Sequence, residues 1–252
     1  MLRSHARRLL RILSPILPNR LRRSAHPEEV ERAELIFYIR YLRQGMTVFD
    51  VGANVGRLTT LFSGLVGPEG RVFAFEAASP AYERLSSVCV ATGLTNVSLN
   101  HLALTDQEGS VSLNVYDDAH LGWCTMAERP LHDYGIDVRP VGREVVRATT
   151  IDSYSALMGV DVVNLLKIDV EGAEYQVLLG AQRMLRERRI KCCLFEFGAT
   201  TFDNGNNPEE IVSYLASVGY KIRNVVWGDQ IFPGRKEARN ARFSMHVAVP
   251  KR

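Results

Sequence analysis

The chain has 252 residues, a hydrophobic fraction of 46% and a formal net charge of +3. This length suits one α/β domain with appendages, and the absence of a run of about 18 or more apolar residues predicts no membrane-spanning helix. Residues 1–25 hold seven arginines and no acid, so the rest of the chain carries a net charge of about −4. A mildly acidic body argues against a general nucleic-acid-binding surface.

The four cysteines predict neither a metal site nor a disulfide. Cys89, Cys124, Cys192 and Cys193 lack the spacing of metal ligands. The last two are adjacent, and neighbours in one strand point to opposite faces of a sheet. A reducing compartment fits best, which predicts a cytoplasmic protein. Asp169, Glu171 and Glu196 could supply oxygen ligands to a divalent cation, but without a metal-spacing motif we predict no metal site.

Residues 1–26 form a predicted basic extension ahead of a single domain at 27–252. Apolar residues recur at helical spacing along one face of this extension: Leu2, Ala6, Leu9 and Leu13. Arginines lie on another face, and Pro15 ends the pattern. A short basic amphipathic helix suits peripheral contact with an anionic membrane surface. A solvated extension that crosses over the domain and an arginine-rich targeting presequence are the alternatives.

The rest of the chain alternates between helix and strand patterns, with Gly and Pro near the ends of the elements. In chain order we predict a helix from Pro27 to about Arg43, a strand at 46–51, a helix at 57–66, a strand at 71–75, a helix from Ser79 to about Thr92, and strands at 97–104 and 109–116. After a long loop at 117–144 follow a strand at 162–168, a helix from about 172 to 187, a strand at 190–197, a helix at 207–218, and strands at 220–226 and 243–249.

A glycine loop, Gly52-Ala-Asn-Val-Gly56, joins the first predicted strand to the next helix. Strand, glycine loop and helix in this order bind nucleotide-like ligands in α/β folds, because glycine lets the backbone approach the ligand closely. The spacing here is Gly-x-x-x-Gly, and Asp50 lies at the end of the strand. A carboxylate at that place would repel a pyrophosphate but could receive the cationic end of S-adenosylmethionine (SAM).

Strands that alternate with helices predict a doubly wound, largely parallel sheet. The last two predicted strands have no helix between them, so we expect them to form an antiparallel pair at one edge. That ending is common among SAM-dependent methyltransferases and absent from most dinucleotide-binding folds.

Four carboxylates lie at or near the ends of predicted strands: Asp50, Glu76, Asp169 and Glu196. The carboxyl ends of parallel strands meet at one crevice, so we expect all four to gather there. Glu76 comes 20 residues after Gly56, where an acid can accept both ribose hydroxyls of an adenosine cofactor; a surface carboxylate is the alternative. Glu171 either caps the next helix, where an acid is favourable, or joins this cluster.

Several short segments, taken together, carry a family resemblance. They are residues 49–56, Glu76, residues 100–104 with Asp106 and Gly109, residues 150–152, residues 167–174 and residues 195–196. In this order they resemble the FkbM family of SAM-dependent methyltransferases over about residues 46 to 220. The run Lys-Ile-Asp-Val-Glu-Gly-Ala-Glu at 167–174 is the most family-specific of them. The resemblance implies a class I methyltransferase (Rossmann-like) fold and methylation of hydroxyl oxygens, often on sugars, polysaccharides or macrolides.

The resemblance also implies roles for single residues. Those that would line the methionine part of SAM are Asp50, Gly52, Asn54 and Gly56. Glu76 would hold the ribose, and the backbone around Ala103 would lie beside the adenine. Asn54 could instead serve only to tolerate a left-handed turn. Residues 117–145 lie outside the resemblance, and we expect them to recognise the acceptor.

Methyl transfer to an alcohol near neutral pH needs a base that removes the hydroxyl proton. Asp169, which the resemblance places near the transferred methyl, is the first candidate, and His120 in the long loop is the second. His132 in the same loop is a weaker candidate, and His101 is expected to be a structural residue within a strand. Lys167 precedes Asp169 by two residues and shares its face of the strand. We expect it to form an ion pair with the carboxylates; orienting the acceptor is the alternative.

Two other functions compete with methyl transfer to a hydroxyl of a sugar, glycan or related natural product. An NAD-dependent oxidoreductase shares the strand, glycine loop and downstream acid. The Gly-x-x-x-Gly spacing, Asp50, the missing Tyr-x-x-x-Lys and the edge strand pair count against it. A non-catalytic SAM-binding scaffold protein would keep the fold, but the intact Glu76 and Asp169 make it a weaker alternative. A nucleic-acid substrate is not predicted, because no Asn-Pro-Pro-Tyr-type motif is present.

Overall fold

The computed structural model describes residues 27–226 and 243–251. The predicted basic extension at 1–26 lies outside these residues, so its helix and its contact with a membrane stay predictions. In the part of the chain that is described, no helix has both the length and the apolar character needed to cross a membrane.

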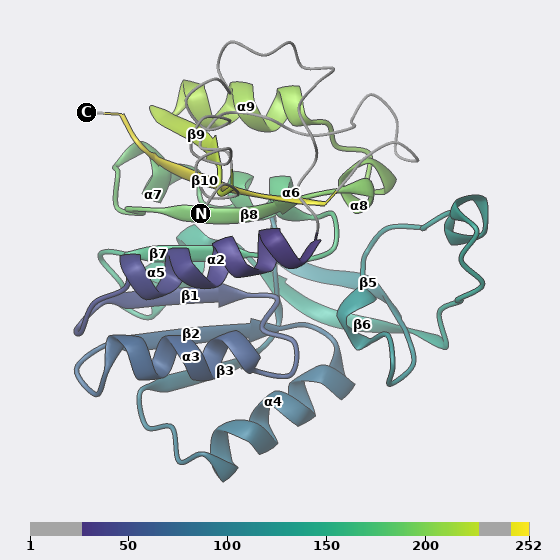
Figure 1. Cartoon of the computed structure of the whole chain (residues 1–252), viewed down its shortest axis with the longest axis horizontal. Coiled ribbons are helices and arrows are strands. Elements are labelled where there is room, and N and C mark those ends of the chain that lie inside the picture. The colour runs from purple at the N-terminus through teal and green to yellow at the C-terminus, as the bar shows by residue number, and fades with distance from the viewer. Residues whose placement is uncertain (1–26, 227–242, 252) are drawn as a thin grey trace, which may run out of the picture.

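A seven-stranded sheet forms the centre of the described structure (Figure 1). In spatial order its strands are β3 (Val97–His101), β2 (Arg71–Glu76), β1 (Thr47–Val51), β7 (Leu165–Ile168), β8 (Cys193–Phe197), β10 (Ser244–Pro250) and β9 (Tyr220–Asn224). The first five are parallel, and β10 is antiparallel to both of its neighbours. The structure therefore confirms a mostly parallel sheet with an antiparallel strand pair at one edge.

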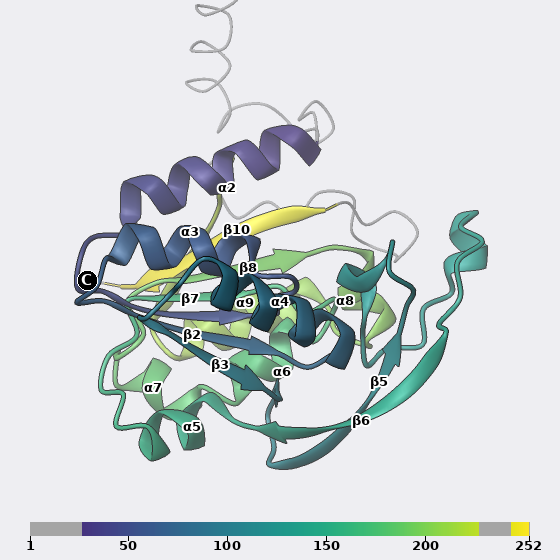
Figure 2. The same ribbon diagram turned by 90° about the horizontal axis from the view of Figure 1, so that it is seen from below.

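Helices cover both faces of this sheet. They are α2 (Pro27–Tyr41), α3 (Arg57–Val66), α4 (Ser79–Ala91), α5 (Ile151–Leu157), α6 (Glu174–Leu179), α7 (Gln182–Arg186), α8 (Ala199–Asp203) and α9 (Pro208–Ser217). Figure 2 shows α2 and α3 above the sheet and α5 and α7 below it. This is the doubly wound arrangement that the alternation of helices and strands predicts.

Alternation along the strands builds a separate core on each face. On β1, Phe49 and Val51 belong to the core that includes residues of α5, α6, α7 and α9. Val48 of the same strand belongs to the core formed with α2 and α3. Since every second side chain shares a face, Asp50 points to the side of α2 and α3. The same alternation places Lys167 of β7 on that side, and it is paired in register with Asp50.

A second, three-stranded sheet lies beside the carboxyl ends of the main strands (Figure 1). Its strands are β4 (Ala103–Leu104), β6 (Gly142–Thr149) and β5 (Gly109–Val115). The prediction of one strand at 97–104 was wrong, because the chain leaves the main sheet after His101 and enters the second sheet at Ala103. Strand β6 was not predicted at all, and the predicted loop at 117–144 was too long because β6 begins at Gly142. A period-two pattern shows a strand but not the sheet to which it belongs.

The predicted helix at 172–187 is divided into α6 and α7. Gly180 lies at the division, and a Cβ there would come within 2.0 Å of the carbonyl oxygen of Thr105. Close packing of this backbone against the second sheet thus accompanies the break. The short helices α5 and α8 are additions to the predicted elements.

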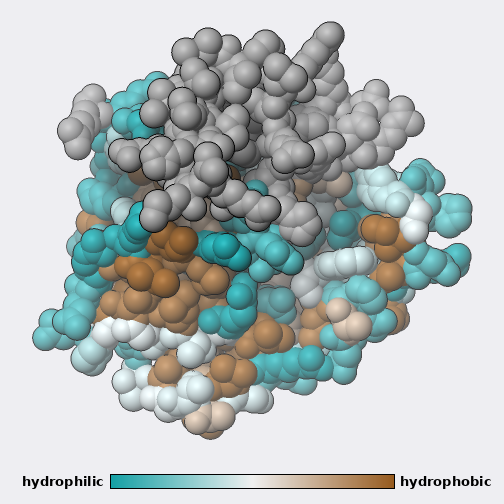
Figure 3. All heavy atoms as spheres, in the orientation of Figure 1, coloured by the Kyte–Doolittle hydropathy of each residue, from teal (hydrophilic) through white to brown (hydrophobic). Residues whose placement is uncertain are grey.

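Hydrophobic side chains gather over α2 on the face shown in Figure 3. The exposed large apolar residues of this helix are Ile36 and Ile39. Its inner face carries Val30 and Tyr38, which are buried in the core beneath it. Helix α2 is therefore apolar on its inner face and on part of its outer face.

Candidate active site

The glycine loop turns sharply over the ends of β1 and β2. Gly52, Asn54 and Gly56 all have positive φ angles, of 73°, 49° and 88°. The N–H groups of Gly52 and Ala53 both donate to the carbonyl oxygen of Phe75, at 3.0 Å each. These bonds tie the loop to the end of β2, directly beside Glu76.

Gly52 leaves no room for a side chain. A Cβ at this position would lie 1.8 Å from the carbonyl oxygen of Asp169, which follows β7. The close approach joins the glycine loop to the segment 169–171. The two motifs that carry the predicted chemistry therefore share one crevice, as expected for the carboxyl ends of adjacent parallel strands.

Glu76, the last residue of β2, is held by the backbone around it. Its Oε2 accepts a hydrogen bond from the Asn54 N–H at 2.7 Å, and its Oε1 accepts one from the Ala78 N–H at 2.9 Å. Burial raises the pKa of this carboxyl, although the backbone donors act in the opposite direction. Because each carboxylate oxygen has two lone pairs, Glu76 can still accept hydrogen bonds from a ligand.

An ion pair between Lys167 and Asp50 lies behind this crevice. The Lys167 Nζ is 3.3 Å from the Asp50 Oδ1 and 3.7 Å from the Asp169 Oδ2. Asp50 also accepts a hydrogen bond from the Thr59 hydroxyl at 2.6 Å. Burial alone would lower the pKa of Lys167, but the charges of Asp50 and Asp169 outweigh burial and raise it. The ion pair expected of Lys167 is present.

Glu171 lies in the wall that follows β7, in a strained conformation. Its φ angle of 52° is unusual for a residue with a side chain. The Thr125 hydroxyl donates to the Glu171 carbonyl at 2.7 Å, and the Arg129 Nη1 lies 3.5 Å from its Oε2. Burial and then the charge of Asp169 raise the pKa of Glu171 to about 8, although Arg129 acts in the opposite direction.

Two neighbouring glutamates complete the surroundings of this wall. Glu196 of β8 is hydrogen-bonded to Asp169, and burial together with the nearby carboxylates raises its pKa well above the usual range. Glu174 accepts hydrogen bonds from the N–H groups of Val170 and Gly172 through its Oε1. The acid that satisfies the backbone before α6 is therefore Glu174. Glu171 belongs with the carboxylates of the crevice.

The loop between β5 and β6 closes the crevice from the other side. It contains two short 3₁₀ helices, η2 (Leu121–Trp123) and η3 (Leu131–Tyr134). The guanidinium of Arg129 lies over the Trp123 ring, 5.5 Å from its centre. Arg129 also pairs with Asp203 at 3.7 Å, and the Tyr134 hydroxyl donates to Asp203 at 2.7 Å. Although the loop lacks long elements, these contacts attach it to the body of the domain.

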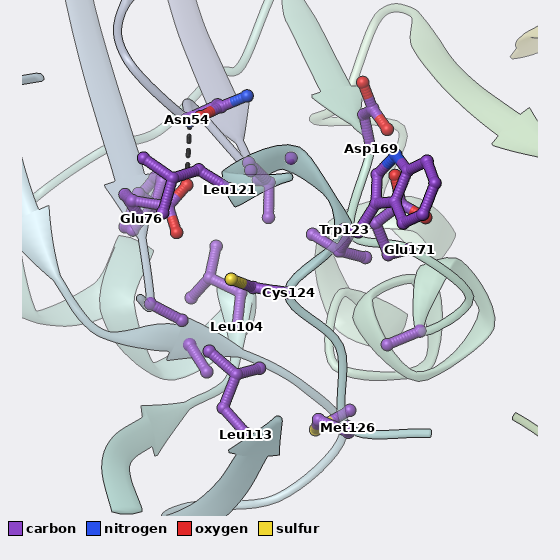
Figure 4. A pocket seen from close by; sticks show the side chains of 18 of the residues that line it. Asn54, Glu76, Leu104, Leu113, Leu121, Trp123, Cys124, Met126, Asp169 and Glu171 are labelled. Carbon is purple, nitrogen blue, oxygen red and sulfur yellow. Dashed lines mark hydrogen bonds between the residues drawn. The ribbon is translucent and has the colours of Figure 1, made fainter. Parts of the chain in front are cut away.

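The result is a cavity of about 320 Å³. Its lining consists of Val51, Gly52, Asn54, Phe75, Glu76, Ala77, Leu102, Ala103, Leu104, Leu113, Leu121, Gly122, Trp123, Cys124, Met126, Asp169, Val170, Glu171, Ala173 and Glu196. Figure 4 shows Asn54 and Glu76 on one side and Asp169, Trp123 and Glu171 together on the other. Of the described residues that line it, four are acids and none is Lys, Arg or His.

The structure brings together five of the residues predicted for the site: Gly52, Asn54, Glu76, Ala103 and Asp169. Asp50 is fully buried and does not line the cavity, because it lies level with Lys167 inside the sheet, two residues before the level of Glu76 and Asp169. The cavity therefore gathers Glu76, Asp169 and Glu196 with Glu171 as the fourth carboxylate, in place of Asp50.

Two further candidates lie outside the lining. Gly56 packs against Leu85 of α4, and a Cβ there would lie 2.8 Å from the Leu85 side chain. His120 precedes the lining residues Leu121 to Trp123, but its Nδ1 forms a hydrogen bond of 2.6 Å with the Asp117 carboxylate. His101 stacks on Tyr82 at the end of β3, with ring centres 4.6 Å apart, and His132 is exposed.

The sequence left two roles open for Glu171, helix capping or membership of the carboxylate cluster, and it did not single out Trp123. The signal for Glu171 was its position three residues beyond a buried strand and two residues after Asp169, which helix capping explained equally well. Trp123 stands in a segment without periodicity, so no pattern could single it out. In the described part of the chain, no cluster of His, Cys, Asp and Glu has the arrangement of a metal site.

The sheet order, the glycine loop and the acid at the end of β2 define a class I methyltransferase. Comparison with known proteins gives the family: residues 50–222 match the model of the methyltransferase FkbM domain. The chain belongs to the FkbM methyltransferase family. It is a methyltransferase, and its cofactor is SAM.

Individual relatives agree with this assignment. The chain is 29% identical over 220 residues to 31-O-demethyl-FK506 methyltransferase FkbM of Streptomyces tacrolimicus, covering 78% of this chain and 81% of the relative. Its fold is similar to that of methyltransferase FkbM from Methylobacillus flagellatus KT, with a TM-score of 0.50 at 16% identity, covering 89% of this chain and 56% of that one. It is also similar to Streptococcus mutans SMU.1697c in complex with S-adenosylhomocysteine (SAH), with a TM-score of 0.50 at 8% identity, covering 91% of this chain and 100% of that one. These two structural likenesses bear on the fold alone.

The residues of the cavity fit SAM. Asn54 Oδ1 is buried, and none of the described residues donates a hydrogen bond to it. Together with four carboxylates, it makes the polar lining rich in acceptors. SAM offers hydroxyl and ammonium donors and a sulfonium cation to such a lining, whereas the diphosphate of NAD would meet repulsion.

Proposed function

We propose that this protein transfers the methyl group of SAM to a hydroxyl oxygen of a sugar, glycan or related natural product. The observation that carries the proposal is the cavity itself: carboxylates that can receive a proton stand beside the glycine loop, under a wall formed by the β5–β6 loop. The Streptomyces tacrolimicus relative, whose name gives 31-O-demethyl-FK506 as its substrate, supports an oxygen acceptor.

Each part of the lining has a role in this proposal. Glu76 accepts the ribose hydroxyls with the lone pairs that its backbone donors leave free. Asn54 and the Gly52 backbone hold the methionine part, and the backbone at Ala103 borders the adenine. Asp50 and Gly56 lie outside the cavity lining and fix the conformation of the glycine loop. Leu121, Trp123 and Met126 supply the wall that meets the acceptor.

When bound, SAM supplies a methyl group on a positively charged sulfur. The protein has to hold the acceptor oxygen about 3 Å from that methyl and in line with it. It also has to accept the hydroxyl proton, because an alcohol is a poor nucleophile near neutral pH. Asp169 and Glu171 lie on the correct wall for this step. The Trp123 ring and the apolar loop exclude water from it.

Isothermal titration with SAH tests the cofactor assignment of the site. We expect micromolar binding to the wild type and at least about a tenfold loss in Glu76→Ala, since two ribose hydrogen bonds disappear. Glu83→Gln, an exposed acid on α4, is the matched control and should bind SAH as the wild type does. Binding of NAD in place of SAH would favour an NAD-dependent oxidoreductase over a methyltransferase.

A second experiment tests the acceptor class. Protein is incubated with methyl-labelled SAM and a panel of hydroxyl-bearing sugars, glycans and macrolides. We expect label in a methyl ether, which survives mild base. Label that mild base removes would indicate a carboxyl ester and would contradict a hydroxyl acceptor.

A further inference from the structure

The lining of the cavity carries an excess of acidic side chains. Four acids line the cavity, with no basic side chain among its described lining residues. Two cations approach the acids from behind: Lys167 lies 3.7 Å from Asp169, and Arg129 lies 3.5 Å from Glu171. The carboxylates therefore exceed the cations that can neutralise them.

Glu171 is surrounded by charge from several elements. The titratable and charged groups that face it are Lys167 and Asp169 at the end of β7, Glu174 of α6, Glu196 of β8, Arg129 in the β5–β6 loop, and Tyr116 and Cys124 at the start of that loop. Burial, with the charge of Asp169, raises the pKa of its carboxyl to about 8. With Arg129 and Lys167 included, this pKa favours the protonated carboxyl at pH 7 when the cavity holds no ligand.

The other two acids of this wall have partners of their own. The Lys167 Nζ lies 3.7 Å from the Asp169 Oδ2. Glu196 is hydrogen-bonded to Asp169, and its pKa lies well above the usual range. The Glu171 side chain lines the cavity, and the Arg129 Nη1 lies 3.5 Å from its Oε2. Its backbone is held by Thr125 in a left-handed conformation.

We propose that Glu171 is a charge-responsive carboxyl, which gives up its proton when the sulfonium of SAM enters the cavity and holds a proton when the neutral thioether SAH is there. The sulfonium favours the ionised carboxylate by direct attraction in a site of low dielectric constant. SAH lacks that charge. Binding of SAM is then linked to the release of a proton, and binding of SAH is not.

Glu171 is then the proton acceptor in catalysis, a role that rests on the proposed function. The acceptor oxygen uses a lone pair to form the bond to the methyl carbon, and the methyl–sulfur bond breaks with its electron pair staying on sulfur. The hydroxyl proton passes to the Glu171 carboxylate, so charge and atoms balance. The same loss of positive charge that ends the transfer makes Glu171 a stronger base.

Calorimetry tests the linkage without an acceptor. SAM and SAH are titrated into the protein at pH 7 in phosphate and in Tris, whose ionisation enthalpies differ, so the buffer dependence counts the protons released. We expect close to one proton more for SAM than for SAH in the wild type. The affinity for SAM, relative to SAH, should rise by about tenfold between pH 6 and pH 7.

Three variants make the result specific to Glu171. Glu171→Gln should release no more protons with SAM than with SAH. Its affinity for SAM relative to SAH should change by less than about twofold between pH 6 and pH 7. Arg129→Met should keep the release but move it to higher pH, because Arg129 lowers the pKa of Glu171. Glu108→Gln, an exposed acid beyond the site, should match the wild type. The ammonium groups of the ligands contribute equally in all variants.

Equal proton release by SAM and SAH, or an unchanged release in Glu171→Gln, would overturn this inference and leave the proposed function intact. Failure of both ligands to bind the wild type would instead contradict the proposed function. If Glu171→Gln does not fold, the shift in Arg129→Met still decides between the outcomes.

Discussion

The ammonium nitrogen of Lys167 lies 2.6 Å from the carbonyl oxygen of Gly52, so a buried side chain of β7 holds the first glycine of the loop. The same nitrogen contacts the carboxylates of Asp50 and Asp169. Lys167 is only 2% exposed and Asp50 is fully buried. One cation thus fixes the glycine loop and keeps the charge of Asp169 balanced.

Lys167→Met should therefore damage both stability and binding. Removal of one partner of a buried ion pair leaves an uncompensated charge and costs about 3–5 kcal/mol. We expect a loss of that size in the free energy of unfolding, measured with urea, and at least about a tenfold weaker affinity for SAH because the loop is no longer held.

The double variant Asp50→Leu with Lys167→Met separates the two effects. Replacing both charges with apolar groups can be nearly neutral for stability, so unfolding should return toward the wild type. Binding of SAH should stay weak, because the hydrogen bond to the Gly52 carbonyl is still missing. Full recovery of SAH binding in the double variant would show that Lys167 has no part in shaping the loop.

Gly52→Ala should be far more harmful than Gly45→Ala. Both glycines have positive φ angles, 73° at Gly52 and 77° at Gly45. A Cβ at Gly52 would lie 1.8 Å from the Asp169 carbonyl oxygen, whereas nothing lies within 4 Å of a Cβ at Gly45. We expect about 1–2 kcal/mol for the backbone strain at Gly45 and about 3 kcal/mol or more at Gly52.

Urea unfolding of the two variants measures this difference. SAH binding should be lost in Gly52→Ala and unchanged in Gly45→Ala. Equal destabilisation of both would mean that strain alone, and not the contact with Asp169, requires glycine in the loop.

Much of the main sheet could be predicted because its strands are short apolar runs bounded by glycine and acids. The glycine loop, Glu76 and the 167–174 motif each follow such a run, and topology then brings them together. The second sheet could not be predicted in the same way. Strand β6 pairs with β4 and β5, and its sequence does not show which partners it has.

For the site, sequence position predicted the face of the sheet better than the depth within it. Asp50 shares its face with Glu76, but it is paired with Ala74 and so lies two residues before the level of Glu76, inside the sheet. Asp50 therefore meets Thr59 and Lys167 behind the cavity. Glu171 lies at a left-handed residue, and only the packing of Thr125 and Arg129 shows that its carboxyl belongs to the cavity.

SAH should protect Cys124 from alkylation by iodoacetamide. Cys124 is partly exposed and lines the cavity (Figure 4), whereas Cys89, Cys192 and Cys193 are buried. Burial raises the pKa of the Cys124 thiol, so the reaction is best followed at about pH 8.5, where more thiolate is present. At ten times the dissociation constant of SAH, labelling should slow by about tenfold.

Mass spectrometry of the digested protein identifies the labelled cysteine, and Cys124→Ser serves as the control for background labelling. NAD at the same concentration should give no protection. Undiminished labelling of Cys124 in the presence of bound SAH would place the cofactor outside this cavity.

Glu174 should make the protein less stable as pH rises. Its Oε1 accepts two backbone hydrogen bonds, but its Oε2 is buried and has no hydrogen-bond partner among the described residues. Burial raises its pKa from the usual 4.5 to about 7 in the folded state. The folded protein therefore holds this proton more tightly than the unfolded chain does. The stabilisation is complete below pH 4.5 and is lost as pH rises through 7.

The corresponding loss is about 3 kcal/mol between pH 4.5 and pH 8. Glu174→Gln cannot titrate, so its free energy of unfolding, relative to the wild type, should rise by about that amount over the same range. Urea unfolding at a series of pH values, without cofactor, measures both curves. Glu69→Gln, at an exposed turn, should run parallel to the wild type. If Glu174→Gln does the same, Glu174 is already ionised in the folded protein near pH 5, and its two backbone donors outweigh the cost of burying its charge.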